Sequence, residues 1–501
     1  MRLVVCITLA LVFPAVAQEK KAPASQKKAA PATPEELVKQ ADEKIAAGDL
    51  DGAAELLRRA VELAGASGDP ALRLGRLLES RYELDGAIDA YKDAASKLSG
   101  APKGEALARL AVAQELRGRP AAAASAEAAA AADPEGAWTK LALARARARA
   151  GQADEALALA ADAVAKGAGP PAVCARAFAH EVKGDLAAAE KDYREALAAP
   201  EAKVAAGIGL ARVLRKSGRA AEAEPILAKT LEAAPGAVDA YKESARVKIA
   251  LNRPDEALGD AATAAALAEN DPEAQRLAKE VAVAKALGYL AAGQADLAIQ
   301  DLTRLRDESP DFADARVGLA KAYVAKRQAD PALAELQKAV EVDPASAEAW
   351  YQLGYVTHVL KGNGAGAVAP FEKAVAAEPG NLVYRTALGA ALNAAGQFDR
   401  AVAELTKVSL TPGYERAEAW IYLGQAQIGA KRYKDAVAPL DKATQLAPQS
   451  DQAWALLGWA YFGMKDADNF KKAAGKAKAL GYTEPTLLQY LQRIEAGEPI
   501  K

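Results

Sequence analysis

The sequence contains few of the residues from which metal sites and catalytic centres are built. Its 501 residues include two cysteines and two histidines, and the histidines, His180 and His358, are far apart in the chain. A structural zinc site needs several nitrogen or sulfur ligands close together. Neither a multi-histidine nor a Cys/His metal site is therefore expected, and no cofactor is predicted.

Cys174 and His180 do not form a nucleophile and its base. They are six residues apart in a stretch that we expect to be helical, which separates them by about 240° around the helix axis. A single cysteine on an alanine-rich helix is more typical of a small buried apolar residue. We therefore expect Cys174 to be buried.

Neither sign of charge is in excess, because 64 Lys and Arg residues balance 66 Asp and Glu residues, for a formal net charge of −2. Nucleic-acid binding depends on clustered Lys and Arg, so no nucleic-acid partner is expected. Aromatic residues make up only 5% of the chain although 51% of it is hydrophobic, and the excess is alanine. Alanine is the strongest helix former, which predicts a helical chain packed through small side chains.

The N-terminus has the pattern of a secretory signal peptide. Arg2 precedes an apolar stretch, Leu3 to Phe13, and the small-x-small site Ala15-Val16-Ala17 follows. The apolar stretch is too short to span a bilayer, so no transmembrane segment is expected here. We expect residues 1–17 to be removed and the mature protein to be exported to the periplasm or secreted. Cys174 is then its one cysteine, which excludes an internal disulfide.

Residues 18–33 contain mainly Lys, Ala, Pro and Ser and lack apolar periodicity. This composition predicts a disordered tether. Its four lysines offer a contact to a peptidoglycan or membrane surface, but a solvated linker is the simpler interpretation.

From Pro34 to the C-terminus the sequence repeats a pattern of two helices about every 34 residues. The two clearest copies read Trp350-x-x-Leu353-Gly354, Ala367, Phe371, Ala374, Pro379 and Trp420-x-x-Leu423-Gly424, Ala436, Leu440, Ala443, Pro448. Large residues fill the seam between the helices, Gly and Ala let the backbones approach, and Pro ends the second helix. This pattern resembles the tetratricopeptide repeat, with one residue inserted in the first of these copies.

Weaker copies follow the same register towards both ends of the chain. The resemblance implies an all-α fold in which residues 34–481 form a right-handed superhelical solenoid of about thirteen helix-turn-helix units. The last copy is irregular, because Phe470 stands where the pattern has a small residue. A further helix, Glu484 to Ala496, carries Leu487, Leu488, Leu491 and Ile494 on one side, so we expect residues 482–501 to form a capping helix and a tail.

The glycine-rich stretch Gly362-Asn363-Gly364-Ala365-Gly366 lies between the two helices of the copy with the inserted residue. No strand is expected before it and no P-loop lysine follows it. We interpret it as an elongated turn that absorbs the insertion.

Members of the tetratricopeptide-repeat family usually bind extended peptides or partner helices on a concave surface lined by first helices. The resemblance implies that residues one after the Trp position, one after the Gly position and one turn further face this groove. In the C-terminal repeats these candidates include Tyr351, Tyr355, His358, Thr386, Asn393, Ile421, Gln425, Trp459 and Phe462. Aromatic rings mixed with hydrogen-bonding groups are typical of a recognition surface.

In the middle repeats the groove positions include a basic patch that would suit an acidic segment. Its members are Arg212, Arg215, Lys242 and Arg246. The family's carboxylate clamp for chaperone tails needs Lys and Asn at paired groove positions, and Arg246 stands where the Asn belongs. A co-chaperone role is therefore not predicted.

The repeats account for every stretch longer than a loop, so no enzyme is expected. The resemblance implies an exported scaffold that mediates protein–protein interactions in a bacterial envelope complex, such as a motility, pilus, secretion or outer-membrane machine. The alternative is a glycan-binding component of polysaccharide synthesis or export, in which Tyr351, Tyr355 and Trp459 stack on sugar rings. The hydrogen-bonding candidates favour a peptide.

Residues Ala121 to Ala132 are nearly all alanine and bury little surface per residue. In a repeat array each unit is stabilised largely by its neighbours, so we predict a more flexible N-terminal third and a firmer C-terminal half. Hydrogen exchange that found the N-terminal units as protected as the last four would contradict this.

Overall fold

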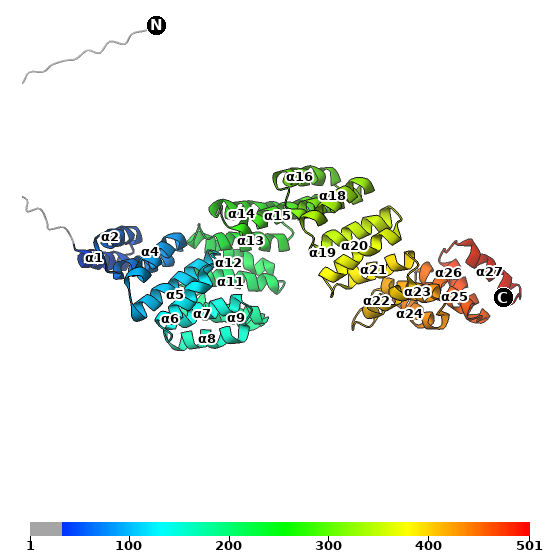
Figure 1. Ribbon diagram of the computed structural model, residues 1–501, viewed down its shortest axis with the longest axis horizontal. Coiled ribbons are helices and arrows are strands. Elements are labelled where there is room, and N and C mark those ends of the chain that lie inside the picture. Colours follow the sequence, from blue (N-terminus) through cyan, green and yellow to red (C-terminus); the bar gives the residue numbers. More distant parts are fainter. Residues whose placement is uncertain (1–32, 501) are drawn as a thin grey trace, which may run out of the picture. The chain divides into compact units, whose positions relative to one another are not determined.

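The structure, a computed structural model, describes residues 33–500 (Figure 1). Within this range the chain forms helices joined by short loops, without a strand. The predicted signal peptide and residues 18–32 of the predicted tether lie outside the described residues. Thr33, the last residue of the predicted tether, caps the first helix, because its side chain accepts a hydrogen bond from the backbone N–H of Glu36.

The described residues fall into two compact units, one of residues 33–188 and 198–202 and the other of residues 189–197 and 203–500. The first unit contains α1 (Pro34–Ala46), α2 (Leu50–Leu63), α3 (Asp69–Ser80), α4 (Leu84–Lys97), α5 (Gly100–Leu116), α6 (Ala122–Ala132), α7 (Ala137–Arg149), α8 (Ala153–Ala165) and α9 (Pro170–Lys183). Helix α10 (Leu186–Ala196) begins in the first unit and continues in the second.

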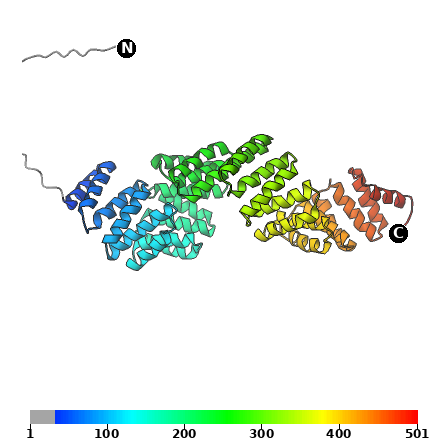
Figure 2. The same ribbon diagram turned by 45° about the horizontal axis from the view of Figure 1, so that its top comes forward.

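The second unit contains the remaining helices, shown from two directions in Figures 1 and 2. They are α11 (Lys203–Lys216), α12 (Ala220–Ala233), α13 (Val238–Ala250), α14 (Pro254–Leu267), α15 (Pro272–Ala291), α16 (Ala295–Glu308), α17 (Ala313–Ala325), α18 (Ala329–Val342), α19 (Ala347–Tyr355), η1 (Val356–Leu360), α20 (Gly364–Ala377), α21 (Leu382–Ala394), α22 (Phe398–Ser409), α23 (Ala417–Gly429), α24 (Tyr433–Leu446), α25 (Asp451–Gly463), α26 (Ala467–Ala479) and α27 (Pro485–Glu495).

Within the described residues, helices α1 to α26 follow one another in the order that thirteen consecutive repeats predict, and the single helix α27 comes last. This confirms the all-α repeat fold. Odd-numbered helices are the first helices of their pairs. Leu487, Leu491 and Ile494 of α27 are buried in a cluster with Phe470 and Ala474 of α26, as the capping interpretation predicts. None of the described helices has the length and hydropathy needed to cross a membrane.

In the pairs α21/α22 and α23/α24 the seam depends on a small residue facing a large one. A Cβ atom placed on Gly424 would overlap the side chain of Leu440, and one on Gly389 would overlap Leu405. Both leucines are fully buried. Glycine is therefore needed at these two positions for the helices to approach.

The last pair reverses this arrangement. Phe470 takes the position that is alanine in α24, and Ala474 takes the position of Leu440. A Cβ atom on Gly458 would meet Ala474 only at ordinary contact distances of 3.4–3.6 Å. The irregularity in the sequence is thus a compensated exchange of a large and a small residue.

This exchange predicts opposite results for one substitution at two equivalent glycines. Gly424→Ala should destabilise the protein by about 1–3 kcal/mol, because it overpacks the seam. Gly458→Ala should be neutral or stabilise by up to about 1 kcal/mol, because alanine is the better helix former and its Cβ atom fits. Urea unfolding of both variants measures the difference. Equal destabilisation by the two substitutions would contradict the packing.

The inserted residue is absorbed in a first helix. Helix α19 continues as the π-helix η1, in which the Lys361 N–H donates to the Val356 carbonyl at 3.1 Å, a longer step than the α-helical one. Three residues then separate η1 from α20, as three separate α23 from α24. The elongated-turn interpretation is therefore wrong. Asn363 instead caps α20 by accepting from the Gly366 N–H at 2.8 Å.

Helix α6 packs as its composition predicts. Only Ala126 and Ala129 of this helix are buried, whereas α20 buries Phe371 and Val368. The greater flexibility of the N-terminal third stays a prediction for hydrogen exchange. Cys174 on α9 is buried, as predicted.

Candidate peptide-binding surface

The first helices of successive pairs lie in contact along most of the second unit. Such contacts join α11 to α13, α13 to α15, α15 to α17, α17 to α19, α21 to α23 and α23 to α25. Three candidate groove residues, Thr386, Asn393 and Ile421, are consequently buried. Their expected exposure is wrong, because residues of neighbouring helices and of the segment before α23 pack against them.

Thr386 and Asn393, the two polar residues of this set, form hydrogen bonds or close polar contacts within the repeat array. The Thr386 hydroxyl donates to the Leu382 carbonyl at 2.7 Å and lies 3.5 Å from the Tyr414 hydroxyl. The side-chain amide of Asn393 donates to the Tyr422 carbonyl at 2.8 Å. Asn393 therefore ties α21 to α23, and its role is structural.

Helices α19 and α21 approach each other less closely than the neighbouring pairs of first helices. Aromatic rings lie between them. The Tyr351 ring stacks on the Tyr384 ring with centroids 4.8 Å apart, and lies 5.8 Å from Phe371 and 6.4 Å from Tyr355. We call these four residues the tyrosine seam.

An ionised carboxylate fixes one side of the tyrosine seam. The Tyr384 hydroxyl donates to Glu348 at 3.0 Å, and Lys321 pairs with the same carboxyl group at 2.8 Å. Burial alone would raise the pKa of Glu348, but hydrogen bonds from Lys321, Gln352 and Tyr384 hold it below its usual value. Burial and the nearby Glu348 charge raise the pKa of Tyr384. The phenol therefore remains protonated and donates.

The other side of the seam is open to solvent. Tyr351 and Tyr355 are half-buried, and their hydroxyls have no hydrogen-bond partner among residues 33–500. Val359, one turn beyond Tyr355, is 52% exposed. His358 is half-buried, and its Nδ1 atom has no partner. Burial lowers the pKa of His358, which favours the neutral imidazole.

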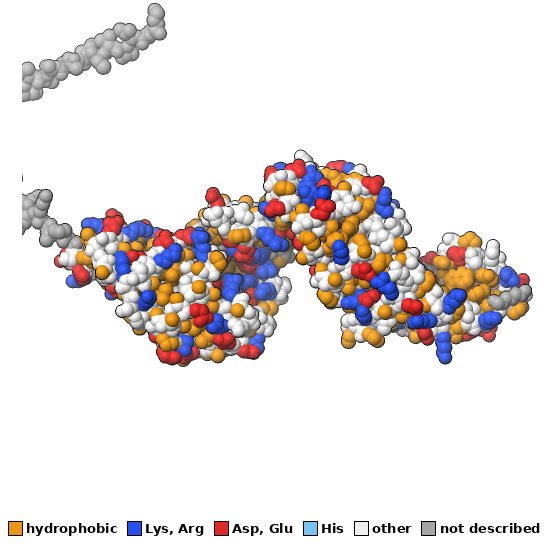
Figure 3. Space-filling view, viewed as in Figure 1, with side chains coloured by type: hydrophobic (Ala, Val, Ile, Leu, Met, Phe, Trp, Pro, Cys, Tyr) orange, Lys and Arg blue, Asp and Glu red, His pale blue; other side chains and the backbone are white. Residues whose placement is uncertain are grey.

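Of the remaining candidates, Gln425 is half-buried on α23, and the two aromatic ones pack beneath the capping helix. Phe462 lies 4.5 Å from the Tyr490 ring of α27, and Trp459 meets Tyr490 edge-on at 6.1 Å. Figure 3 shows hydrophobic side chains gathered over this C-terminal end. Trp459 and Phe462 thus belong to the cap, and the tyrosine seam is a separate feature.

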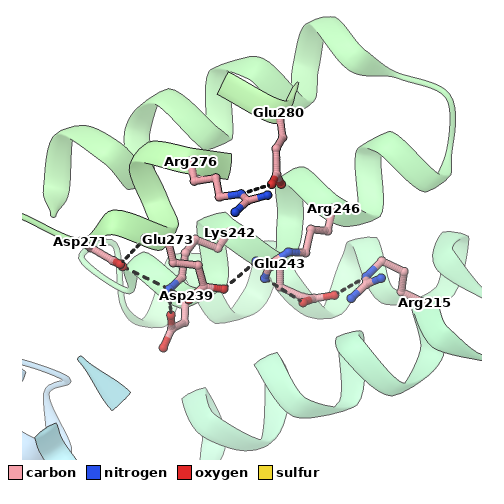
Figure 4. A network of polar contacts seen from close by, with 9 residues as sticks. All are labelled: Arg215, Asp239, Lys242, Glu243, Arg246, Asp271, Glu273, Arg276 and Glu280. Atoms are coloured by element: carbon pink, nitrogen blue, oxygen red, sulfur yellow. Dashed lines mark hydrogen bonds and ion pairs between the residues drawn. The ribbon is translucent and has the colours of Figure 1, made fainter. Parts of the chain in front are cut away.

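The predicted basic patch is neutralised by carboxylates of the same and of the following repeats (Figure 4). Lys242 is only 5% exposed and pairs with Asp239 at 2.7 Å, Asp271 at 3.2 Å and Glu273 at 2.8 Å. Arg246 pairs with Glu273 at 2.7 Å.

The two other members of the patch also have partners. Arg215 donates to Glu243 at 2.6 Å, and Arg212 has interactions of its own. The expectation of a free basic surface is therefore wrong. A sequence signal for this existed, since Lys242 and Glu273 are 31 positions apart and Arg215 and Glu243 are 28 apart, close to one repeat.

The ion network predicts a loss of stability in acid. Burial alone would raise the pKa of Glu273, but Lys242 and Arg246 lower it from 4.5 to about 2. Its contribution is present above the unfolded pKa and is lost as the pH falls from about 4.5 towards 2. Glu273→Gln should therefore lower the melting temperature at pH 7 and reduce the further loss between pH 5 and pH 2. An unchanged acid dependence in the variant would contradict this.

Comparison with known families decides the relationship that the repeat pattern suggests. One tetratricopeptide-repeat model matches residues 289–353, and a second matches residues 38–102, 208–275 and 386–451. The chain is a tetratricopeptide-repeat protein. No curated protein matches it significantly.

Several solved structures are similar to this tetratricopeptide-repeat protein. One belongs to the APC/C hetero-tetramer Cut9–Hcn1, at 15% identity and a TM-score of 0.38, covering 92% of this chain and 96% of that chain. Pseudomonas aeruginosa pilF shares 18% identity over 44% of this chain and 97% of its own, with a TM-score of 0.37. YrrB, a TPR protein with an unusual peptide-binding site, shares 22% identity over 38% of this chain and 97% of its own, with a TM-score of 0.34.

Two seam residues of this tetratricopeptide-repeat protein, Phe371 and Tyr384, were not groove candidates. Phe371 is a consensus core residue, and Tyr384 precedes the Trp position of its repeat. The sequence signal for the seam was the spacing of Tyr351 and Tyr384, which places two large rings on successive first helices. Among residues 33–500 no group of three or more His, Cys, Asp or Glu residues is arranged to hold a metal ion.

Proposed function

We propose that this protein is a non-catalytic scaffold whose tyrosine seam binds an extended segment of a partner protein. The observation that carries the proposal is the open side of the seam, where Tyr351, Tyr355 and Val359 offer ring, aliphatic and hydroxyl contacts together. Aromatic side chains supply large contact area at low entropic cost, which makes them frequent centres of binding energy. Tetratricopeptide-repeat arrays commonly use such extended surfaces for binding.

The ring geometry favours a peptide over a sugar. Sugar stacking needs a flat, exposed ring face, and one face of Tyr351 is covered by Tyr384 at 4.8 Å. The free hydroxyls of Tyr351 and Tyr355 suit the backbone carbonyls and N–H groups of an extended chain. The bound segment is expected to place an apolar side chain against Tyr355 and Val359.

The proposal includes export and action in an envelope complex. It is supported by the signal-peptide pattern of residues 1–17, with its apolar stretch and its small-x-small site. Fractionation of cells that express the full chain, compared with a form lacking residues 2–17, tests this part. Cytoplasmic recovery of both forms would overturn export without affecting the binding surface.

Site-specific photo-crosslinking tests the seam. A photoreactive residue replaces Tyr355 in one form and the exposed Ala376 of α20 in a matched control. The expected result is one or two proteins captured only from position 355, through a single contiguous segment. That segment, made as a peptide, should bind the purified protein, and Tyr355→Ala should weaken binding at least about tenfold.

Two outcomes would overturn the peptide-binding role. Capture of the same proteins in equal amounts from positions 355 and 376 would show that the tyrosine seam does not bind them selectively. Capture from neither position, together with binding of oligosaccharides that Tyr355→Ala abolishes, would establish the glycan alternative.

A further inference from the structure

Helix α26 carries four lysines that have no ion pair, whereas many cations elsewhere in the second unit are paired. At the ends of several first helices, basic residues pair with acidic residues of the preceding repeat. Examples are Lys326 with Asp296 at 2.5 Å, Lys361 with Asp330 at 2.7 Å and Arg432 with Asp399 at 2.8 Å. The four lysines of α26 have no ion pair or hydrogen bond to any described residue. They are Lys471, Lys472, Lys476 and Lys478.

These lysines occupy the outer side of the helix. Phe470, Ala473, Ala474 and Ala477 form its buried stripe, and at about 100° per residue the lysines fall on the opposite arc. Lys472, Lys476 and Lys478 are exposed, and Lys471 is half-buried. Gly475 lies in the middle of this arc, with no atom within 4 Å of a Cβ placed on it. We call the four lysines and Gly475 the α26 basic face.

The arrangement is not favourable for the isolated chain. Lys472 and Lys476 are four residues apart on one helix, and like charges at this spacing destabilise it. Glycine in a helix interior costs about 1 kcal/mol relative to alanine. Asp468 is the one acidic residue of the helix, and Asp466 is used to cap it by accepting from the Asn469 N–H at 3.1 Å. A partner that supplies negative charge would offset the repulsion between the lysines.

The shape of the basic face indicates which anionic partner fits. A peptide needs a groove or pockets between elements, whereas this face is the outer side of a single helix with a small residue at its centre. An extended anionic surface can approach all four ammonium groups at once. Anionic lipid headgroups form such a surface, and lysines close to it are attracted to it.

We propose that the α26 basic face docks the C-terminal end of the array on an anionic lipid membrane. Binding is electrostatic and peripheral, so it weakens as salt screens the lysines. Each lysine near an anionic bilayer contributes roughly fivefold in affinity. The inference does not depend on the tyrosine seam.

Vesicle sedimentation of the mature protein tests this inference. Vesicles of phosphatidylcholine with about one third phosphatidylglycerol are compared with pure phosphatidylcholine, at low and at high salt. The protein should sediment with the anionic vesicles at low salt only. The quadruple variant Lys471→Gln, Lys472→Gln, Lys476→Gln, Lys478→Gln should reduce binding by roughly 100-fold or more. Glutamine is also a good helix former, so circular dichroism should be unchanged.

A matched control removes four lysines that, like those of α26, have no ion pair to a described residue. It carries Lys203→Gln, Lys229→Gln, Lys434→Gln and Lys442→Gln, of which the first three are exposed and the last is half-buried, and it should retain nearly all binding, as should Tyr355→Ala. Equal loss in the control would show a general charge effect and overturn the proposal. Failure of the unaltered protein to bind anionic vesicles would also overturn it. Binding to a polyglutamate peptide in place of vesicles, lost in the α26 variant, would assign the face to an acidic polypeptide.

Discussion

Replacing Phe470 with alanine is expected to destabilise the C-terminal end of the array by about 3–5 kcal/mol. The side chain is 0% exposed, and its ring centroid lies 5.5 Å from that of Phe462. It shares a core cluster with Leu487 and Leu491 of the capping helix. Its removal leaves a cavity that Ala474 on the next turn is too small to fill.

The loss should appear first at the C-terminal end, because each repeat is held mainly by its neighbours. Hydrogen exchange should show α25, α26 and α27 opening before the middle repeats, and urea unfolding should give the free energy. The double variant Phe470→Ala with Ala474→Leu recreates the arrangement of Ala436 and Leu440 in α24. It should recover much of the loss. A double variant less stable than Phe470→Ala alone would contradict the exchange of large and small positions.

Replacing Lys242 with methionine is expected to cost about 3 kcal/mol, at the lower end of the range for breaking a buried ion pair. The substitution keeps the volume but leaves Asp239, Asp271 and Glu273 without the cation that they share. Glu273 is partly exposed and retains Arg246, which limits the effect. Thermal and urea unfolding measure it, together with hydrogen exchange of α13 and α15.

Two companion variants show whether the charge network causes this loss. Lys442→Met removes a half-buried lysine that has no ion pair among the described residues, and should change stability by less than about 0.5 kcal/mol. Adding Asp271→Asn and Glu273→Gln to Lys242→Met removes the uncompensated carboxylates and should restore stability in part. If Lys242→Met alone left the free energy of unfolding unchanged, the ion network would not stabilise the protein.

The repeat pattern predicted the fold because it depends on how each helix packs against its immediate neighbour. Gly424 and Leu440 indicate how closely the two helices of one pair approach each other. They lie within about 20 residues of each other in the sequence, so this approach is set locally. The same pattern located the capping helix from the spacing of Leu487, Leu491 and Ile494. It misplaced the insertion, because a one-residue excess fits either a longer turn or a π-helical step such as η1, and composition does not distinguish them.

The candidate site was predicted less well. Tyr351, Thr386 and Ile421 occupy the same position of successive first helices, yet only Tyr351 remains half exposed. The difference arises from the next repeat in each case. The Tyr384 ring lies opposite Tyr351, whereas α23 packs closely against α21 and the Tyr414 hydroxyl, just before α23, lies 3.5 Å from Thr386. Lys242 likewise occupies a predicted groove position, but it pairs with Asp271 and Glu273 at the start of the following first helix, α15.

The sequence by itself determined the helix pairs, their number and the glycine and proline positions that shape them, because periodic burial and close backbone approach are properties of one helix and its immediate neighbour. Only the tertiary structure decided which polar and aromatic residues remain open. Whether a side chain is exposed, and which charge it pairs with, depends also on the helices of the next repeat, about one repeat further along the chain. The residue pattern of a single helix says nothing about those neighbours.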